Sequence, residues 1–206
     1  MAYDAATIAA LQSGQLVLRD FLTIHGWDED GDPRDFCWWT GEDNVTTNVV
    51  SAVDGSTVSR NFIGGNTLVE VPTIVDAIGL EARSYDFGLS QIHSAVQDMV
   101  RAYSIRLAVV EFHRGVFSPS TWSLVSTPFP RFLGRVDGVQ VETPAVGGEG
   151  KIVVTAISDV IDLTRTIPDM KSDEQQKLRL GDRFRKWADT AGDIEVWWGQ
   201  AKGKSA

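Results

Sequence analysis

The sequence predicts a mainly β protein of the α+β class, with an antiparallel barrel-like or sandwich-like body and two or three short helices. Many short stretches are rich in β-branched and aromatic residues, and turn-forming residues separate them. Only a few stretches combine good helix formers with apolar residues at helical spacing. A chain of 206 residues can bury a sizeable core, because roughly 70% of the unfolded surface is removed from water at this size.

The N-terminal part is expected to hold one helix followed by a β-hairpin. Residues 3–12 contain helix formers with apolar residues three positions apart, and Ser13 and Gly14 supply a stop. The composition then changes to β-branched and aromatic residues in 15–25 and again in 35–40. A turn-forming stretch separates these two strands, so we expect them to pair as a hairpin.

The middle of the chain is expected to consist of strands with one inserted helix near 91–102. Residues 41–65 are polar, and glycines punctuate their short β-prone pieces. The other expected strands are 66–72, 84–90, 104–114, a second hairpin over 129–144 that turns at Asp137 and Gly138, and a long strand over 151–163.

A change of composition divides the chain into a mainly β body over 1–170 and a C-terminal arm over 171–206. The arm begins with a polar stretch of little β character. A short helix beginning near Asp182 would place the aromatic residues of this region on one side. Residues 194–199 alternate like a terminal strand that a glycine ends.

The charge balance argues against stable binding to nucleic acid or to an acidic membrane surface. The formal net charge is -9, whereas such affinity comes from Lys and Arg. Residues 171–206 hold eight Lys and Arg against six Asp and Glu, which leaves eleven against twenty-two in the rest. No basic, apolar leader and no long apolar run is present, so we expect neither secretion by a signal peptide nor a membrane span.

An aspartate-rich stretch, Asp28, Asp30 and Asp32, places carboxylates at positions 1, 3 and 5 of a calcium-loop pattern. The rest of the pattern fails, because Pro33 stands where the glycine belongs and Trp39 where the bidentate glutamate belongs. An exposed hairpin tip explains the same residues, and ion binding by this loop is the open alternative.

No catalytic, cofactor or metal site is expected, and we predict that the protein is not an enzyme. His25, His93 and His113 are scattered, and none belongs to a metal-ligand motif. The single cysteine, Cys37, is flanked by aromatic residues in a predicted strand, which favours a buried structural thiol over a nucleophile. A hydrolase that uses Asp or Glu with water has only the abundance of carboxylates in its favour.

The aromatic and basic residues of the C-terminal arm form the candidate interface. Trp and Arg are the residues most enriched among binding hot spots, and basic neighbours would favour an acidic subunit or partner. A structural role in the core is the alternative, because Trp is mostly buried. The candidate interface residues are Phe184, Trp187, Trp197, Trp198, Arg183 and Arg185.

Several phrases in residues 69–199 resemble proteins of the tail tip of long-tailed bacteriophages. They are a strand-helix-strand region, "FLGRVD" at 132–137, "LTR" at 163–165 before a proline, and "GDRFRK" at 181–186 followed by "WG" at 198–199. The similarity is to the hub and minor tail (baseplate ring) proteins of siphophages and of related gene transfer agents. It extends over roughly two thirds of the chain.

The resemblance implies a structural virion protein that forms part of a ring or hub at the distal end of the viral tail. Such a protein lies between the tail tube or distal tail protein and the central fibre-bearing hub protein. It is made in the bacterial host cytoplasm and assembles as a homotrimer, or as a homohexamer, through whose lumen DNA passes without stable binding. Some relatives hold an iron-sulfur centre with a C-terminal cysteine cluster, which this chain lacks.

A carbohydrate-binding β module of a phage or cell surface is the alternative function. The pairs Trp38-Trp39 and Trp197-Trp198 motivate it, because aromatic faces stack on sugars. Adjacent residues of a strand point to opposite sides, however, so neither pair would form one flat platform.

Overall fold

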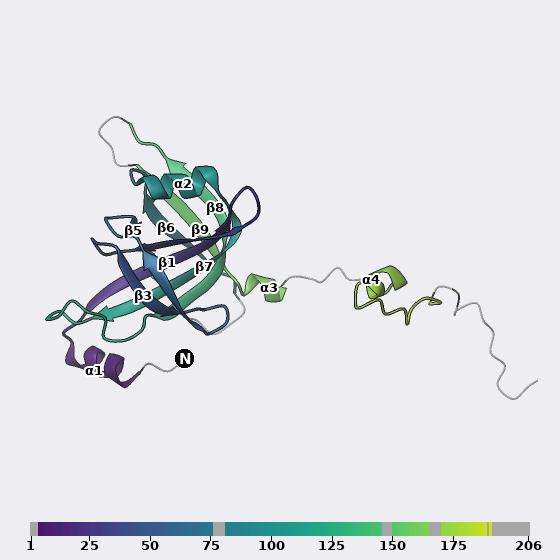
Figure 1. Ribbon diagram of the computed structural model, residues 1–206, viewed down its shortest axis with the longest axis horizontal. Helices are drawn as coiled ribbons and strands as arrows, with labels where there is room; N and C mark the ends of the chain where they lie inside the picture. The colour runs from purple at the N-terminus through teal and green to yellow at the C-terminus, as the bar shows by residue number, and fades with distance from the viewer. Residues whose placement is uncertain (1–3, 76–80, 146–149, 165–169, 189, 191–206) are drawn as a thin grey trace, which may run out of the picture. The chain divides into compact units, whose positions relative to one another are not determined.

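The structure is a computed structural model that describes residues 4–75, 81–145, 150–164, 170–188 and 190. The chain divides into two compact units, Met1–Thr164 and Arg165–Ala206. Their elements are drawn in Figure 1. In chain order these are α1 (Ala5–Ser13), β1 (Val17–Trp27), β2 (Pro33–Trp39), β3 (Val45–Val50), β4 (Thr57–Phe62), β5 (Leu68–Glu70), β6 (Ser84–Ser90), α2 (Ser94–Ala102), β7 (Ser104–Phe117), β8 (Phe129–Glu142), β9 (Lys151–Ser158) and α3 (Ile161–Thr164), with α4 (Asp173–Lys177) in the second unit.

The first unit is built on one curled antiparallel sheet of seven strands, in the order β2-β1-β7-β8-β9-β6-β5 (Figure 1). Strand β1 pairs with β2 as the predicted hairpin and with β7 on its other side, where Val17 lies opposite Phe117. Strands β3 and β4 form a separate two-stranded sheet. The predicted mainly β class is therefore confirmed.

The two faces of the main sheet bury two hydrophobic clusters. The larger cluster includes Trp38 and Phe112, whereas the smaller one includes Trp39 and Phe21, whose rings stack with centroids 5.5 Å apart. Successive residues of a strand point to opposite faces, which explains why adjacent Trp38 and Trp39 enter different clusters. Both faces of β2 are covered here, and these indoles are 1% and 8% exposed.

Helix α2 corresponds to the helix predicted near 91–102, and it covers part of the larger cluster. Its Val96 and Met99 are fully buried, three positions apart on one face. The helix begins after His93, whose Nδ1 accepts a hydrogen bond from the backbone N–H of Ala95 (3.3 Å). A side-chain acceptor at this position satisfies a backbone donor that has no partner within the helix.

The β3–β4 hairpin contributes Val49 and Phe62 to the smaller cluster. It meets the main sheet at one parallel bridge, between Trp38 of β2 and Ile63 just after β4. The N–H of Ile63 donates to the carbonyl oxygen of Cys37 (2.9 Å), and the N–H of Trp39 donates to the carbonyl oxygen of Ile63 (3.2 Å). The two sheets are thus joined at an edge as well as packed face to face.

The predicted turn at Asp137 and Gly138 is wrong. Strand β8 runs through both residues, and its pairing with β9 shifts register between Val136 and Gly138. Such a shift is a β-bulge, a place where strands tolerate glycine. The hairpin partner of β8 is therefore β9.

The predicted long strand over 151–163 is also too long. Strand β9 ends at Ser158, and α3 begins at Ile161. The side chain of Ser158 accepts from the N–H of Val160 (3.5 Å), and the N–H of Asp162 donates to the carbonyl oxygen of Asp159 (3.0 Å). These local hydrogen bonds turn the chain out of the strand.

The second unit contains α4, a short helix that the sequence reasoning did not assign. Ser172 caps it by accepting from the N–H of Gln175 (3.2 Å), and its first turn is acidic as the helix dipole favours. Leu180 and Gly181 then adopt left-handed backbone, with φ values of 54° and 75°. No described helix of either unit is long and apolar enough to cross a membrane.

Candidate functional site

The aromatic segment of the second unit does not form the helix predicted to begin near Asp182. Residues 184–188 adopt turn structure instead. The Oδ1 atom of Asp182 accepts a hydrogen bond from the backbone N–H of Phe184 (3.0 Å). Local bonding of this kind competes with helix formation, and the left-handed Gly181 directly before it has the same effect.

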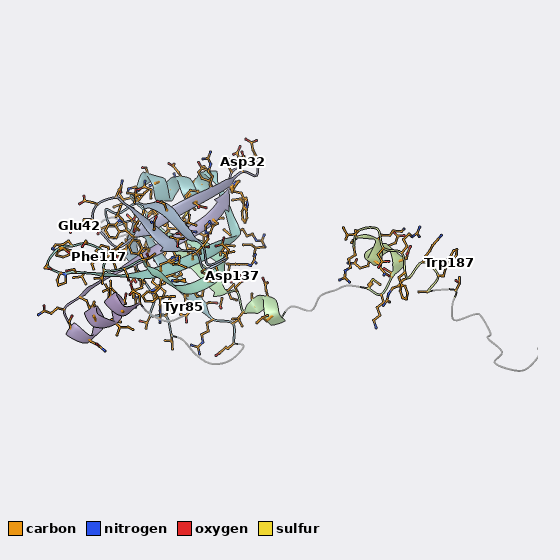
Figure 2. All side chains as sticks on the ribbon, turned by 60° about the horizontal axis from the view of Figure 1, so that its bottom comes forward. Asp32, Glu42, Tyr85, Phe117, Asp137 and Trp187 are labelled. Carbon is orange, nitrogen blue, oxygen red and sulfur yellow. The ribbon has the colours of Figure 1, made fainter. Side chains whose placement is uncertain are left out.

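Phe184 and Trp187 are largely exposed, at 88% and 65% of their surfaces. Figure 2 marks Trp187 on the second unit. The Nζ atom of Lys186 lies 4.7 Å from the centroid of the Trp187 ring, within the range of a cation–π contact. A cation therefore accompanies the exposed indole.

The two arginines of the candidate interface differ in their surroundings. Arg183 Nη2 lies 2.6 Å from Asp173 Oδ2, so this arginine ties the turn segment to α4. The hydrogen bond raises the pKa of Arg183 and lowers the pKa of Asp173. Arg185 makes no ion pair within the part of the chain that the structure describes. Of the two, Arg185 has the charge left for an external partner.

The exposed apolar surface extends beyond the predicted aromatic residues. Met170, Leu178 and Leu180 are 75%, 79% and 106% exposed, and no described residue of this unit is buried. Residues 170–188 and 190 carry six basic and three acidic side chains. We name residues 170–188 the basic apolar segment. Its exposed apolar side chains are those of Met170, Leu178, Leu180, Phe184 and Trp187.

The remaining predicted interface residues, Trp197 and Trp198, lie outside the described residues, as does the strand predicted at 194–199. The other tryptophan pair, Trp38 and Trp39, is buried in the two clusters of the first unit. Neither of its rings presents a face on which a sugar could stack.

A buried ionic cluster in the first unit escaped the sequence reasoning. Glu111 of β7 is fully buried, and its Oε1 accepts from Arg60 Nη2 (2.8 Å) and His25 Nε2 (2.9 Å). Its Oε2 accepts from the backbone N–H of Ala52 (2.8 Å). The other ring nitrogen of His25, Nδ1, lies 2.7 Å from Asp35 Oδ1.

The hydrogen bonds of this cluster decide its protonation. Burial alone would lower the pKa of His25, but hydrogen bonds with Asp35 and Glu111 raise it to about 9. Burial alone would raise the pKa of Glu111, but hydrogen bonds from His25, Arg60 and the Ala52 backbone hold it far below its usual value. At neutral pH two cations therefore face two carboxylates.

His113, also fully buried, lies beside this cluster as a neutral ring. Burial lowers the pKa of His113, and its Nε2 donates to the carbonyl oxygen of Val50 (2.7 Å). Together with Glu111 and its partners it fastens β1, β2, β4 and the end of β3 to β7. The oxygens of Glu111 already accept three hydrogen bonds and are closed to solvent, so we assign this arrangement a role in stabilising the fold.

Two further candidates from the sequence take structural roles. Burial raises the pKa of the Cys37 thiol to about 11, so it stays protonated at neutral pH. The aspartate-rich stretch is the β1–β2 turn, with Asp32 at the tip in Figure 2, and Asp28 Oδ1 accepts from the N–H groups of Asp30 (3.1 Å) and Asp32 (2.8 Å). Among the described residues, no group of three His, Cys, Asp or Glu could hold a metal.

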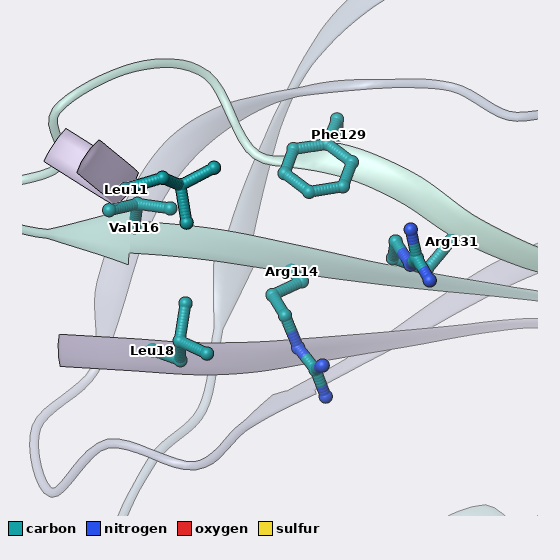
Figure 3. Close-up of a pocket in the computed structure, with 6 residues that line it drawn as sticks. All are labelled: Leu11, Leu18, Arg114, Val116, Phe129 and Arg131. Atoms are coloured by element: carbon teal, nitrogen blue, oxygen red, sulfur yellow. The ribbon is translucent and has the colours of Figure 1, made fainter. Parts of the chain in front are cut away.

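A small pocket of about 190 Å³ lies where α1 approaches β1, β7 and β8 (Figure 3). Figure 3 shows Leu11, Leu18 and Val116 at one end and Arg114 and Arg131 toward the other. The Arg114 guanidinium is bound to Asp20, with an Nε to Oδ1 distance of 2.7 Å. The pocket is smaller than the roughly 300–1,000 Å³ of most small-molecule sites.

Comparison with known proteins adds no assignment to this geometry. No protein-family model matches the chain, and no curated protein is significantly similar to it in sequence. The resemblance to phage tail-tip proteins therefore remains a prediction from the sequence phrases.

Proposed function

We propose that the chain is a structural virion protein of a phage tail tip. In this role it forms part of a ring or hub between the tail tube or distal tail protein and the central fibre-bearing protein. The phrases "FLGRVD", "LTR" and "GDRFRK" support the proposal from the sequence. The mainly β body is compatible with it.

The observation that carries the proposal is the basic apolar segment. Its large apolar side chains are exposed within their own unit, and water-exposed apolar surface of this kind marks protein interfaces. Trp187 and Arg185 are of the residue types that dominate binding energy at interfaces. A ring subunit needs such a surface, because head-to-tail contacts must hold it to a neighbour.

Charge supports an acidic neighbour for this segment. Residues 1–170 carry twenty-two Asp and Glu against eleven Lys and Arg, and tail-tip subunits of this kind would attract a basic segment. An acidic lumen would also let DNA pass without sticking, because its phosphates are repelled. We therefore place the surplus carboxylates of the body at the channel in this proposal.

The test compares two exposed tryptophans. Trp187→Ala removes the indole of the basic apolar segment, whereas Trp122→Ala removes one from the first unit that is 63% exposed. We expect Trp187→Ala to weaken ring assembly about tenfold, measured by the light-scattering mass of the purified protein against concentration. Both variants should keep the melting temperature of the wild type, because neither indole is buried.

Two outcomes would count against the proposal. Equal loss of assembly in both variants would show a general effect of removing exposed apolar surface. Infectious particles whose tails lack the protein, seen by imaging with a labelled antibody, would remove the virion role itself.

A further inference from the structure

A second pocket lies in the wedge between β2 and β4, beside helix α2. Its volume is about 520 Å³, and its lining includes Phe36 of β2, Asn61 of β4 and Ala95 of α2. The two strands meet at the bridge between Trp38 and Ile63, and no further pairing joins them among the described residues. The pocket therefore opens between two strand edges, at the place where the two sheets separate.

The outer edge of β2 is available beside this pocket. Strand β2 is the end strand of the main sheet, and its outer edge makes two backbone hydrogen bonds in the described structure, both with Ile63. These involve Cys37 and Trp39, and the alternation along a strand places the backbone groups of Asp35 on the same side. Open edge groups of this kind accept an added strand from another chain.

Two buried donors beside the pocket have no hydrogen-bond partner within the described residues. They are Nε1 of Trp38 and Nε of Arg60, and both residues line the pocket at 1% and 7% exposure. Arg60 is held in place, because its Nη1 donates to Thr23 (3.2 Å) and its Nη2 to Glu111. A buried donor without an acceptor costs free energy, and a bound chain would relieve this cost only where its carbonyl oxygens reach these two atoms.

The charge at the pocket favours a cation. Asp98 lines it and makes no ion pair among the described residues, whereas the charge of Asp35 is offset by protonated His25. The charge of Arg60 is already offset by Glu111. Phe36 and Tyr103, in edge-to-face contact at 5.0 Å, supply apolar surface against which the stem of a Lys or Arg side chain can pack.

We infer that this wedge binds an extended peptide segment, donated by another protein, that adds a strand to β2 and places a Lys or Arg side chain beside Asp98. The open backbone edge favours a peptide over a saccharide, because it presents donors and acceptors at the spacing of a strand. A saccharide would need an exposed aromatic face, and Trp38 is buried. This site involves other residues than the basic apolar segment and stands or falls separately from the proposed function.

The test uses the full-length protein and two synthetic heptapeptides. The first is Thr-Val-Thr-Arg-Thr-Val-Thr with blocked ends, and the second has Glu in place of its Arg. Titration followed by amide chemical shifts should move the signals of Asp35, Cys37 and Asn61. We expect the Arg peptide to bind about tenfold more tightly than the Glu peptide, because only the former complements the Asp98 carboxylate.

Matched variants on α2 locate the binding. Ala95→Trp fills the pocket and should abolish the shifts, whereas Ala102→Trp, on an exposed position of the same helix, should leave them unchanged. Asp98→Asn changes no packing and should weaken the Arg peptide about threefold. This last variant keeps the test decisive if the larger side chain at position 95 disturbs folding.

The inference is overturned by any of three results. The first is absence of binding by the Arg peptide at its solubility limit, and the second is equal binding to the wild type and Asp98→Asn. The third is a shift of the same amides by maltoheptaose with none by the peptide, which would make the wedge a saccharide site.

Discussion

Arg60 Nη2 lies 2.8 Å from Glu111 Oε1, and the two side chains are only 6% and 1% exposed. Removing two charges from water is costly, and their attraction compensates for it only when the remaining polar atoms are also bonded. His25 and the backbone of Ala52 complete the bonding of the Glu111 carboxylate. The cluster therefore links strands that are far apart in sequence through one buried carboxylate.

Breaking the buried pair on one side should be more harmful than removing both partners. We expect Glu111→Gln to lower the free energy of unfolding by about 3 kcal/mol, because Arg60 then keeps a buried charge with no counter-ion. The double variant Glu111→Leu with Arg60→Met removes both charges and should lose less than Glu111→Gln. Urea unfolding of the variants measures this, and a double variant that loses as much stability as Glu111→Gln, or more, would contradict it.

His25 should make the stability depend on pH. Its pKa rises from 6.5 to about 9 on folding, so the folded state binds the proton more tightly. The stabilisation is complete below pH 6.5 and disappears as the pH rises through 9. We expect the wild type to lose about 2 kcal/mol between pH 6.5 and 9 in urea unfolding, and His25→Gln to lose much less.

The measurement of stability against pH should stop near pH 9, because ionisation of the buried Cys37 thiol also changes the stability above that pH. Its pKa is raised from 9.0 to about 11 on folding, so the unfolded chain ionises first and the stability falls further. If the free energy of unfolding fell equally steeply with pH in the wild type and in His25→Gln below pH 9, the imidazole would not have the role assigned to it.

The Trp39 indole depends on the glycine two residues later. A Cβ atom at Gly41 would overlap the Trp39 ring, which packs in the smaller cluster. Gly41→Ala should therefore destabilise the protein by about 2 kcal/mol, because the ring must leave its packed position. Gly138→Ala is the control, since a Cβ there meets no atom within 4 Å, and thermal unfolding should separate the two variants clearly.

Cys37 should react slowly in the folded protein. Its 7% exposure and its raised pKa both reduce the concentration of accessible thiolate. We expect labelling with Ellman's reagent at pH 8 to be at least about a hundredfold slower in buffer than in 6 M guanidinium chloride. Rapid stoichiometric labelling without denaturant would contradict the burial of β2.

Alternation and composition were enough to predict most strands of the first unit. Strands β1, β2, β6 and β7 lie within a few residues of their predicted positions, since they are rich in the side chains that fit a sheet covered on both faces. The Asp137-Gly138 dipeptide led to the wrong prediction of a hairpin turn, because β-bulges and turns both favour this dipeptide. Only the pairing of β8 with β9 along both sides of the bulge distinguishes the two.

The ionic cluster could not be predicted from spacing, because its members come from separate strands. Glu111 is 86 residues from His25 and 51 from Arg60. One signal was present in the sequence. Glu111 lies between the apolar residues Val110 and Phe112, both of which are buried, and a charge in such a place requires a buried partner. Sequence alone does not say which of the available cations supplies it.

The pairing of β1 with β7 also affects the synthesis of the protein. Val17 pairs with Phe117, which is a hundred residues later in the chain. The hydrogen bonds between β1 and β7 therefore cannot form until both strands have left the ribosome. At about 5–20 residues per second, the first hairpin waits about 5–20 s with its apolar faces in water. The nascent chain is therefore most vulnerable to aggregation before translation has passed β7, and a chaperone that shields the first hairpin would act in that interval.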